Sequence, residues 1–407
     1  MSEHMSDIRQ IKNMFDDYVI GTYTRIPLVL VDGRGSWVRD INADKYLDFF
    51  PGWAVSGLGH CHPEVVQAVT EQVKKIIHVS NNYYNELQAP LAKKIIEYSF
   101  PGKVFFCNSG AEAVEGAIKL SRIFGEGKRY EIISFKNSFH GRTMGALSAT
   151  GQLKYQDGFR PLVGGFKCVE FNDISAVCRA MNDKTVAVIL ELVQGEGGIN
   201  IAAFEFAQEL RKICDERKVL LIFDEVQTGM GRTGEMFCFK HYKVEPDIMT
   251  LAKSLGGGLP IGAFVASLKV ADMLKPGMHA STFGGSPIVC AASLAVFQAI
   301  EKENLLANAR TMGKYLRDKL EQLKSKYKTI KEVRGLGLML ALEMTIEGKE
   351  IVERCLKNRL LINCTHNSVL RIMPAITTNT TEIDIAVDIL DKVLAENKNA
   401  ATDYVYT

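Results

Sequence analysis

A single lysine separates an apolar run from a glycine-rich turn in Ile248-Met249-Thr250-Leu251-Ala252-Lys253-Ser254-Leu255-Gly256-Gly257-Gly258. The run predicts a short buried strand, because it is too short for an ordinary helix and turn residues follow it. Lys253 then lies at the carboxyl end of that strand. The glycines after it allow the backbone to pass close to a bulky ligand. We therefore begin from this strand end as a candidate binding site.

Other short apolar runs also end in polar, charged or glycine residues. Amphipathic helical patterns alternate with these runs, which favours an α/β fold with a mainly parallel sheet. Ligands bind outside the carboxyl ends of parallel strands, so we expect Ser109, Glu191, Asp224 and Lys253 to meet in one crevice. The further expected strands are Val104–Cys107, Glu131–Phe135, Phe166–Phe171, Val186–Leu190, Leu220–Phe223 and Ala263–Ser267.

The pattern changes near Pro287, where long helices and a few short strands replace the alternation. We predict three segments in the 407 residues: an N-terminal segment 1–50 that joins the small domain, a large domain 51–288 and a small α+β domain 289–407. A hairpin is expected over Leu28–Leu47, with its turn at Asp32–Gly35. The expected C-terminal elements are helices Val289–Glu301, Leu305–Tyr327 and Glu382–Glu396, strands Ile330–Val333 and Leu338–Leu342, and a turn at Gly335–Gly337.

Composition excludes several classes of protein. The hydrophobic fraction of 47% and the charged fraction of 24% are those of a globular chain, and a net charge of +2 gives no reason to expect nucleic acid as the main partner. Nine cysteines without metal-ligand spacing indicate reduced thiols and predict no metal site. Met1–Met14 lacks the apolar core of a signal peptide, and no apolar run reaches about 18 residues. We expect no membrane association and a cytoplasmic location.

Lys253 and Asp224 are candidates for a chemical role because each lies at the end of a predicted strand. A lysine in a low-dielectric crevice has a lowered pKa and can attack an aldehyde, although a lysine considered alone more often begins a surface loop. Asp224 can pair with a pyridinium nitrogen or hold Mg²⁺. The Mg²⁺ alternative needs a GxxxxGK[ST] loop, and the sequence contains none; Gly335-Leu336-Gly337 lacks the third glycine of a dinucleotide-binding GxGxxG.

Two loops add a phosphate cradle and an aromatic platform. Gly110 opens a helix after a strand, where backbone N–H groups bind phosphate, and Ser109 can cap the same helix. Phe139 can stack on a planar ring and Arg142 can clamp a carboxylate, although a lone aromatic residue is more often part of the core. His140 considered alone is expected to make a structural hydrogen bond. Glu196 considered alone is an acid in a glycine-rich surface loop.

In combination and in this order, the motifs resemble those of class III, fold type I aminotransferases of the acetylornithine and ornithine type. The resemblance covers nearly the whole chain, from about Tyr23 to the last helix. Two positions depart from the usual pattern: Leu192 replaces a proline, and Trp53 is bulkier than the usual isoleucine. The matching segments are Gly59–Pro63, Asn108–Ala113, Phe139–Thr143, Gln194–Gly198, Asp224–Gly229, Gly231–Gly234, Leu251–Gly258, Ser281–Gly285 and Leu370-Arg371.

The resemblance implies pyridoxal 5′-phosphate (PLP) as cofactor, bound to Lys253 as a Schiff base, with Lys253 as the proton shuttle. It implies a homodimer in which Thr282 reaches the phosphate of the neighbouring subunit. The other implied cofactor contacts are Gly110 and Ala111 with the phosphate, Phe139 and Val226 on the two ring faces, Asp224 at the pyridine nitrogen and Gln227 at the phenolic oxygen.

The resemblance also implies two carboxylate clamps, Arg142 and Arg371, with Ser281 and Tyr23 as further substrate contacts. Glu196 would pair with Arg371 when a substrate presents no α-carboxylate there. Such pairing has a physical reason, because an unpaired arginine in a dry pocket is unfavourable.

The implied activity is transfer of the terminal amino group of N2-acetylornithine to 2-oxoglutarate, as in arginine biosynthesis. Ornithine δ-aminotransfer is the nearest alternative, followed by succinyl-diaminopimelate, succinylornithine or 4-aminobutyrate aminotransfer. An aminomutase or decarboxylase on the same fold is disfavoured by the two clamps, and a protein without enzymatic activity is disfavoured by Lys253 together with Asp224 and Gln227.

Overall fold

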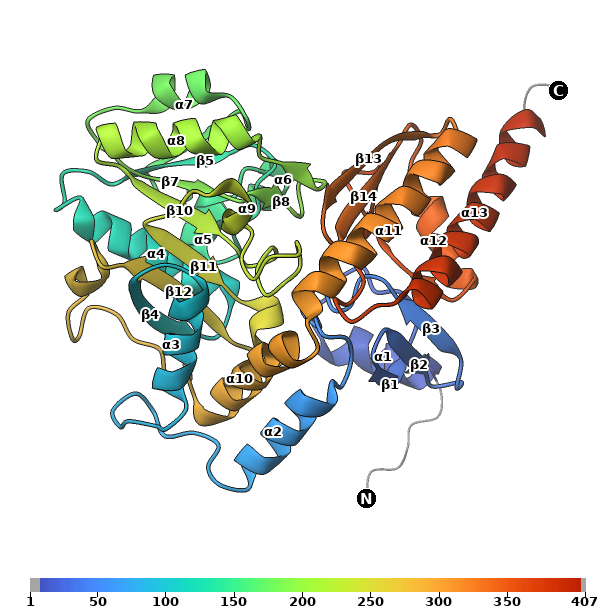
Figure 1. Ribbon diagram of the computed structural model, residues 1–407. Coiled ribbons are helices and arrows are strands. Elements are labelled where there is room, and N and C mark those ends of the chain that lie inside the picture. The colour runs from blue at the N-terminus through green and yellow to red at the C-terminus, as the bar shows by residue number, and fades with distance from the viewer. Residues whose placement is uncertain (1–7, 404–407) are drawn as a thin grey trace.

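The computed structural model describes residues 8–403, so the part of the signal-peptide expectation that falls on residues 1–7 lies outside the described residues. A seven-stranded sheet in the order β4-β12-β11-β10-β7-β5-β6 forms the large part of the molecule (Figure 1). Only β12 runs antiparallel to its neighbours, so the expected mainly parallel sheet is confirmed. Its strands are β4 (Gly102–Cys107), β5 (Glu131–Phe135), β6 (Phe166–Val169), β7 (Thr185–Leu190), β10 (Leu220–Asp224), β11 (Ile248–Leu251) and β12 (Gly262–Ser267).

The central strands are apolar throughout because helices cover both faces of the sheet. On β10, Leu221 and Phe223 belong to one core cluster while Leu220 and Ile222 belong to another, as the alternation of side chains along a strand requires. The first cluster includes residues of α7 (Ile174–Ala180) and α8 (Phe204–Glu216), and the second includes residues of α4 (Gly110–Phe124) and α5 (Met144–Ala149). The helix layers hold the sheet from both faces, so the ends of its strands lie side by side. The site forms at these strand ends.

The small sheet is antiparallel, in the order β13-β14-β17-β16. Strands β16 and β17, which are only three and four residues long, were not predicted from the sequence. The predicted turn at Gly335–Gly337 is wrong: Leu336 pairs with Met339, so the turn is formed by Gly337 and Leu338. The small part contains β13 (Ile330–Leu336), β14 (Met339–Met344), β16 (Asn363–Thr365), β17 (Val369–Ile372), α11 (Leu305–Lys326), α12 (Lys349–Lys357) and α13 (Thr380–Asp403).

The N-terminal sheet contains strands from both ends of the chain, because β3 pairs in parallel with β15 (Leu360–Leu361). The expected hairpin is present, but its turn was predicted two residues too early. Arg34 pairs with Trp37, so the turn is formed by Gly35-Ser36, and Gly33 lies within the strand opposite Val38. The segment contains α1 (Ile8–Tyr18), β1 (Leu30–Arg34), β2 (Trp37–Asp40) and β3 (Lys45–Asp48).

Helix α10 (Pro287–Lys302) connects the large and small sheets and packs against α2 (Pro63–Val73), α3 (Gln88–Tyr98) and the short 3₁₀ segment η1 (Lys253–Gly256). No helix within residues 8–403 is long and apolar enough to cross a membrane. The domain boundaries at 50/51 and 288/289 stay predictions. The remaining short elements are α6 (Leu153–Gln156), α9 (Phe239–Tyr242), β8 (Val193–Gln194), β9 (Asn200–Ile201) and η2 (Ala271–Met273).

Candidate active site

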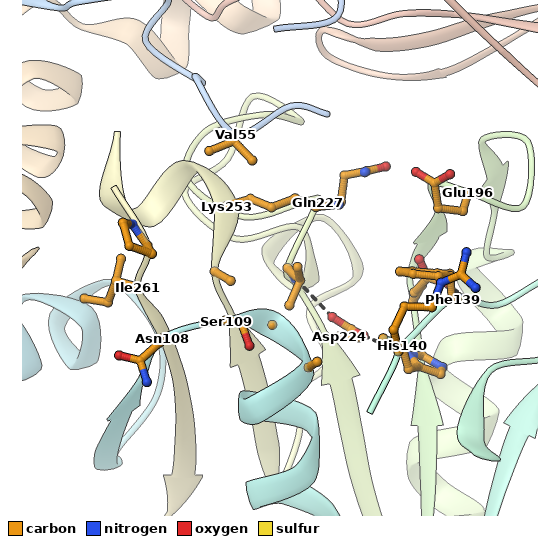
Figure 2. Close-up of a pocket in the computed structure, with 18 of the residues that line it drawn as sticks. Val55, Asn108, Ser109, Phe139, His140, Glu196, Asp224, Gln227, Lys253 and Ile261 are labelled. Atoms are coloured by element: carbon orange, nitrogen blue, oxygen red, sulfur yellow. Dashed lines mark hydrogen bonds and ion pairs between the residues drawn. The ribbon is translucent and has the colours of Figure 1, made fainter. Parts of the chain in front are cut away.

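The carboxyl ends of the large-sheet strands open into one cavity of about 510 Å³ (Figure 2). The expected meeting of Ser109, Glu191, Asp224 and Lys253 is confirmed, because all four line this cavity. The other predicted site residues that line it are Gly110, Ala111, Phe139, Arg142, Glu196, Val226 and Gln227.

Lys253 follows β11 directly and is the first residue of η1. Its backbone is left-handed, with φ of +45°, a conformation that lysine rarely adopts and that is found at functional sites. Figure 2 shows its side chain extending towards Gln227. Removal from bulk water lowers the pKa of Lys253 below the ordinary lysine value, while the charge of Glu196 opposes that change. The lysine is therefore closer to a neutral amine than a surface lysine is.

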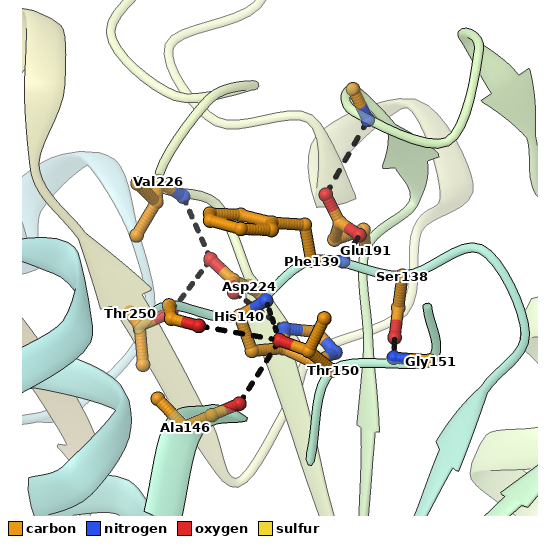
Figure 3. Close-up of polar contacts among 12 residues, drawn as sticks. Ser138, Phe139, His140, Ala146, Thr150, Gly151, Glu191, Asp224, Val226 and Thr250 are labelled. Carbon is orange, nitrogen blue, oxygen red and sulfur yellow. Dashed lines mark hydrogen bonds and ion pairs between the residues drawn. The ribbon is translucent and has the colours of Figure 1, made fainter. Parts of the chain in front are cut away.

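Asp224 at the end of β10 is held by three hydrogen bonds (Figure 3). Its Oδ2 lies 2.7 Å from Nδ1 of His140, and its Oδ1 accepts from the Thr250 hydroxyl at 3.0 Å and from the Val226 N–H at 3.1 Å. Burial opposes the charged imidazole, but the hydrogen bond and charge of Asp224, with a contribution from Glu191, raise the pKa of His140. The contact with Asp224 therefore favours the charged form of the His140 imidazole.

His140 and Thr250 were absent from the predicted site set. A structural hydrogen bond was predicted for His140, but its partner, 84 residues away in the chain, could not be identified from the sequence. Thr250 lies on β11, the strand that leads to Lys253. That position is the only signal in the sequence that could have identified Thr250 as a site residue.

Glu191 ends β7 and joins two loops of the site. Its Oε2 accepts from the Phe139 N–H at 2.9 Å, and its Oε1 accepts from the Gly195 N–H at 3.4 Å. Burial raises the pKa of Glu191 to about 7, against the opposing charge of His140. The loop with the aromatic platform and the glycine-rich loop are therefore tied to one carboxyl group.

The start of α4 has the geometry of a helix N-terminus that can bind an anion. Ser109 caps the helix, its hydroxyl accepting from the Glu112 N–H at 3.2 Å. A Cβ atom placed on Gly110 would lie 2.9 Å from Cγ1 of Val226, so the close approach of these two segments requires glycine. The backbone N–H groups of the first turn have no partner within the helix and can bind an anion.

Glu196 and Arg371 form a buried ion pair, with Nη1 to Oε1 at 2.6 Å and Nη2 to Oε2 at 3.3 Å. Burial opposes the charged carboxylate of Glu196, but the charge and hydrogen bonds of Arg371, with a contribution from the charge of Lys253, together lower the pKa of Glu196. Asn363, which the sequence analysis did not identify, accepts from Nε of Arg371 at 2.9 Å. The guanidinium also faces the ring of Phe50, 4.6 Å from its centroid.

The two unusual positions differ in their relation to this pair. Trp53 is half-exposed, and its ring centroid lies 5.7 Å from the guanidinium carbon of Arg371. Leu192 is buried in the core and does not line the cavity, while its carbonyl accepts from the Ala202 N–H at 2.9 Å. Only Trp53 is therefore placed to affect what binds at Arg371.

The remaining predicted residues lie at the rim of the cavity or away from it. Arg142 is exposed, lines the cavity and stacks on the Tyr155 ring at 4.0 Å. Ser281 accepts from the Asn108 amide at 3.2 Å but does not line the cavity. Thr282 and Tyr23 are exposed and do not line it either. Within the described residues, no cluster of three or more His, Cys, Asp or Glu side chains could hold a metal ion.

The site combines a lysine at a strand end, a buried acid and a helix N-terminus, as expected for fold type I PLP enzymes. Solved structures of this fold match the chain. The ornithine aminotransferase of Toxoplasma gondii, described with partial occupancy of PLP at its active site, is 32% identical, with a TM-score of 0.94 and coverage of 98% of this chain and 96% of that one. The acetylornithine aminotransferase of Elizabethkingia anophelis is 30% identical, with a TM-score of 0.85 and coverage of 96% and 99%.

The family Aminotransferase class-III matches residues 19–394, so the chain belongs to the class-III aminotransferases, which use PLP. Among curated relatives, the acetylornithine aminotransferase of Caldanaerobacter subterraneus subsp. tengcongensis is 54% identical, over 93% of this chain and 98% of that protein. The acetylornithine aminotransferase of Methanocaldococcus jannaschii is 51% identical, over 94% and 97%.

The residues present fit PLP. Both amide atoms of Gln227 and Nε2 of His140 are buried with no hydrogen bond of good geometry to the described residues. Gln227 can therefore donate to an oxygen on a bound ring. Asp224 uses three of the roughly four acceptor positions of a carboxylate, which leaves capacity for a ring N–H.

Proposed function

We propose that the chain transfers the terminal amino group of N2-acetylornithine to 2-oxoglutarate, giving N-acetylglutamate 5-semialdehyde and glutamate, as a step of arginine biosynthesis. The observation that carries the proposal is the Glu196–Arg371 pair beside Lys253, since it can serve two different substrates in turn. The curated relatives named acetylornithine aminotransferase support this choice of amine.

Lys253 holds the cofactor and moves a proton between the substrate carbon that bears the amine and the cofactor. PLP supplies an electron sink for that carbon. Asp224, paired with His140, would keep a proton on the pyridine nitrogen. Gln227 would donate to the phenolic oxygen. Phe139 and Val226 would hold the ring, and Gly110 and Ala111 would hold the phosphate.

Arg371 binds the α-carboxylate of glutamate, which is next to the reacting amine. The reacting end of the acetylated donor has no carboxylate, and Glu196 then neutralises Arg371 in the dry site. The distant carboxylate of this donor goes to Arg142 at the rim, with Tyr23 and Ser281 as further substrate contacts.

The active unit is proposed to be a homodimer in which Thr282 of one chain binds the phosphate in the other. The exposure of Thr282 and of the neighbouring Phe283, which is 61% exposed, supports this assignment. A reducing compartment such as the cytoplasm is proposed because all nine cysteines are free.

A substrate panel with 2-oxoglutarate as acceptor tests the proposed amine. We expect kcat/KM to be highest for N2-acetylornithine, with ornithine, succinylornithine, succinyl-diaminopimelate and 4-aminobutyrate below it. Ornithine is the second candidate, because the Toxoplasma gondii ornithine aminotransferase has the same fold across 98% of this chain. A clear preference for free ornithine would replace the first proposal with the second.

A further inference from the structure

Arg232 is a buried cation without an acidic partner among the described residues. Only 1% of the residue is exposed. Its Nη1 donates to the carbonyl oxygens of Leu338, at 3.2 Å, and Pro374, while Nε and Nη2 have no partner within the described part of the chain. Burial lowers the pKa of Arg232 to about 10. Burying a cation without a counter-charge is unfavourable. The burial of Arg232 therefore indicates that the structure depends on a contact made by its guanidinium.

The two carbonyl acceptors lie in the small sheet, close in the chain to Arg371. Leu338 is in the turn between β13 and β14, and Pro374 follows β17 after one residue. Arg371 is part of β17. Arg232 itself lies in the segment that follows β10 and includes Gln227. Its side chain therefore joins the segment at the cofactor cavity to the strand that carries the clamp.

Backbone contacts make this junction tight. The Leu338 N–H donates to the Arg232 carbonyl at 3.1 Å. A Cβ atom on Gly337 would lie 2.5 Å from the carbonyl carbon of Thr233, so the two segments touch backbone to backbone. With little room for adjustment here, the length and fork of the Arg232 side chain set the separation of the two segments.

We propose that Arg232 is a positioning residue that fixes Arg371 relative to the cofactor. This inference rests on the proposed function, in which Arg371 takes the α-carboxylate of glutamate. That carboxylate is one carbon from the reacting amine, so its place is set by the cofactor and tolerates little displacement of Arg371. Arg142 lies between β5 and α5 in the large part of the molecule, so its position does not depend on Arg232.

Half-reactions of the PLP-loaded Arg232→Met protein test the inference. Methionine removes the positive charge and the branched guanidinium but keeps an apolar chain of similar length. We expect the apparent Kd for glutamate to rise about tenfold and that for N2-acetylornithine less than about threefold. The bound PLP, measured by absorbance, should be unchanged. Arg232→Lys keeps the positive charge but lacks the branched guanidinium. It should also raise the Kd for glutamate more than the Kd for N2-acetylornithine, and it provides the test if the methionine variant does not fold.

Arg310→Met is the matched control. Arg310 also donates to a carbonyl of this segment, that of Gly234, but it is on α11 and has no contact to β17 among the described hydrogen bonds. It should leave both Kd values unchanged. Equal weakening of the two substrates in the Arg232 variants, or loss of PLP, would overturn the positioning role. Failure of the unaltered protein to react with glutamate would instead overturn the proposed function.

Discussion

Glu196 and Arg371 show how one ion pair can serve two substrates. Arg371 is fully buried, and its guanidinium has contacts to Glu196, Asn363 and the carbonyl of Gly195. A carboxyl group with a lowered pKa contributes stability that is present above its ordinary pKa and is lost as the pH falls through the lowered value. At neutral pH the pair is therefore intact, and in the proposed function competition by a substrate carboxylate, rather than protonation, would open it.

Replacing Glu196 by glutamine should change the balance between the two half-reactions. The buried Arg371 then lacks its counter-charge, so glutamate binds more tightly, while the rate with N2-acetylornithine falls about tenfold or more. Single-turnover absorbance measurements between pH 6 and 9 give both rates, and in the unaltered protein their ratio should not vary with pH. Glu170→Gln, at an exposed ion pair with Lys136, is the control. Equal effects on both substrates would contradict the role of Glu196.

At the scale of elements, the strand ends and helix α4 determine where the site lies. β7, β10 and β11 are parallel and buried, so their last residues face the same side of the sheet. Helix α4 begins at that side, and its N-terminus attracts an anion through free N–H groups and the helix dipole. At Gly110, α4 and the segment after β10 approach closely.

Gly110→Ala should weaken cofactor binding. The added methyl group would meet Val226 Cγ1 at 2.9 Å, so either the helix start or the ring face must move. Overpacking of this kind typically costs about 1–3 kcal/mol, which corresponds to a Kd for PLP that is about 5-fold to 150-fold higher. The Kd is measured by adding PLP to the cofactor-free protein and following the absorbance of the bound cofactor. Gly164→Ala, where a Cβ atom has no neighbour within 4 Å, should bind PLP normally. An unchanged Kd for the Gly110 variant would show that the cradle is elsewhere.

The whole molecule has an exposed apolar surface that a single chain does not cover. Tyr84 is fully exposed, Tyr83 is 72% exposed and Phe283 is 61% exposed. The two segments that carry them are tied together, because the Asn81 amide donates to the carbonyl of Gly284 at 2.9 Å. This surface lies next to Thr282 in the sequence and supports the proposed homodimer.

Tyr84→Glu should separate the dimer, because it would bury an unpaired charge in an apolar contact. Light scattering after size-exclusion chromatography should show a protein of half the native mass. PLP occupancy should fall in parallel, since Thr282 no longer reaches the other site. Leu268→Glu, at a 61% exposed leucine in the loop after β12, is the control and should stay dimeric. A Tyr84→Glu protein that keeps its mass and its cofactor would argue against this interface.

The sequence by itself determined the α/β class, the strands of the large sheet and the residues at their carboxyl ends. Apolar runs of four to six residues, followed by Asp224 or Lys253, carry that information locally. The local pattern did not predict β16 and β17, which are too short for a periodic pattern. It also misplaced two tight turns, because strand pairing determines which of two neighbouring glycines lies in the turn.

Only the tertiary structure decided which side chains touch. The contacts of His140 with Asp224, Arg371 with Asn363 and Arg232 with Pro374 join segments that the sheet order brings together. Nothing in the local pattern distinguishes a buried arginine that makes hydrogen bonds to carbonyl groups from a surface arginine. Long-range packing therefore determined the polar contacts of the site and the junction at Arg232, while the local hydrophobic pattern determined where the site would form.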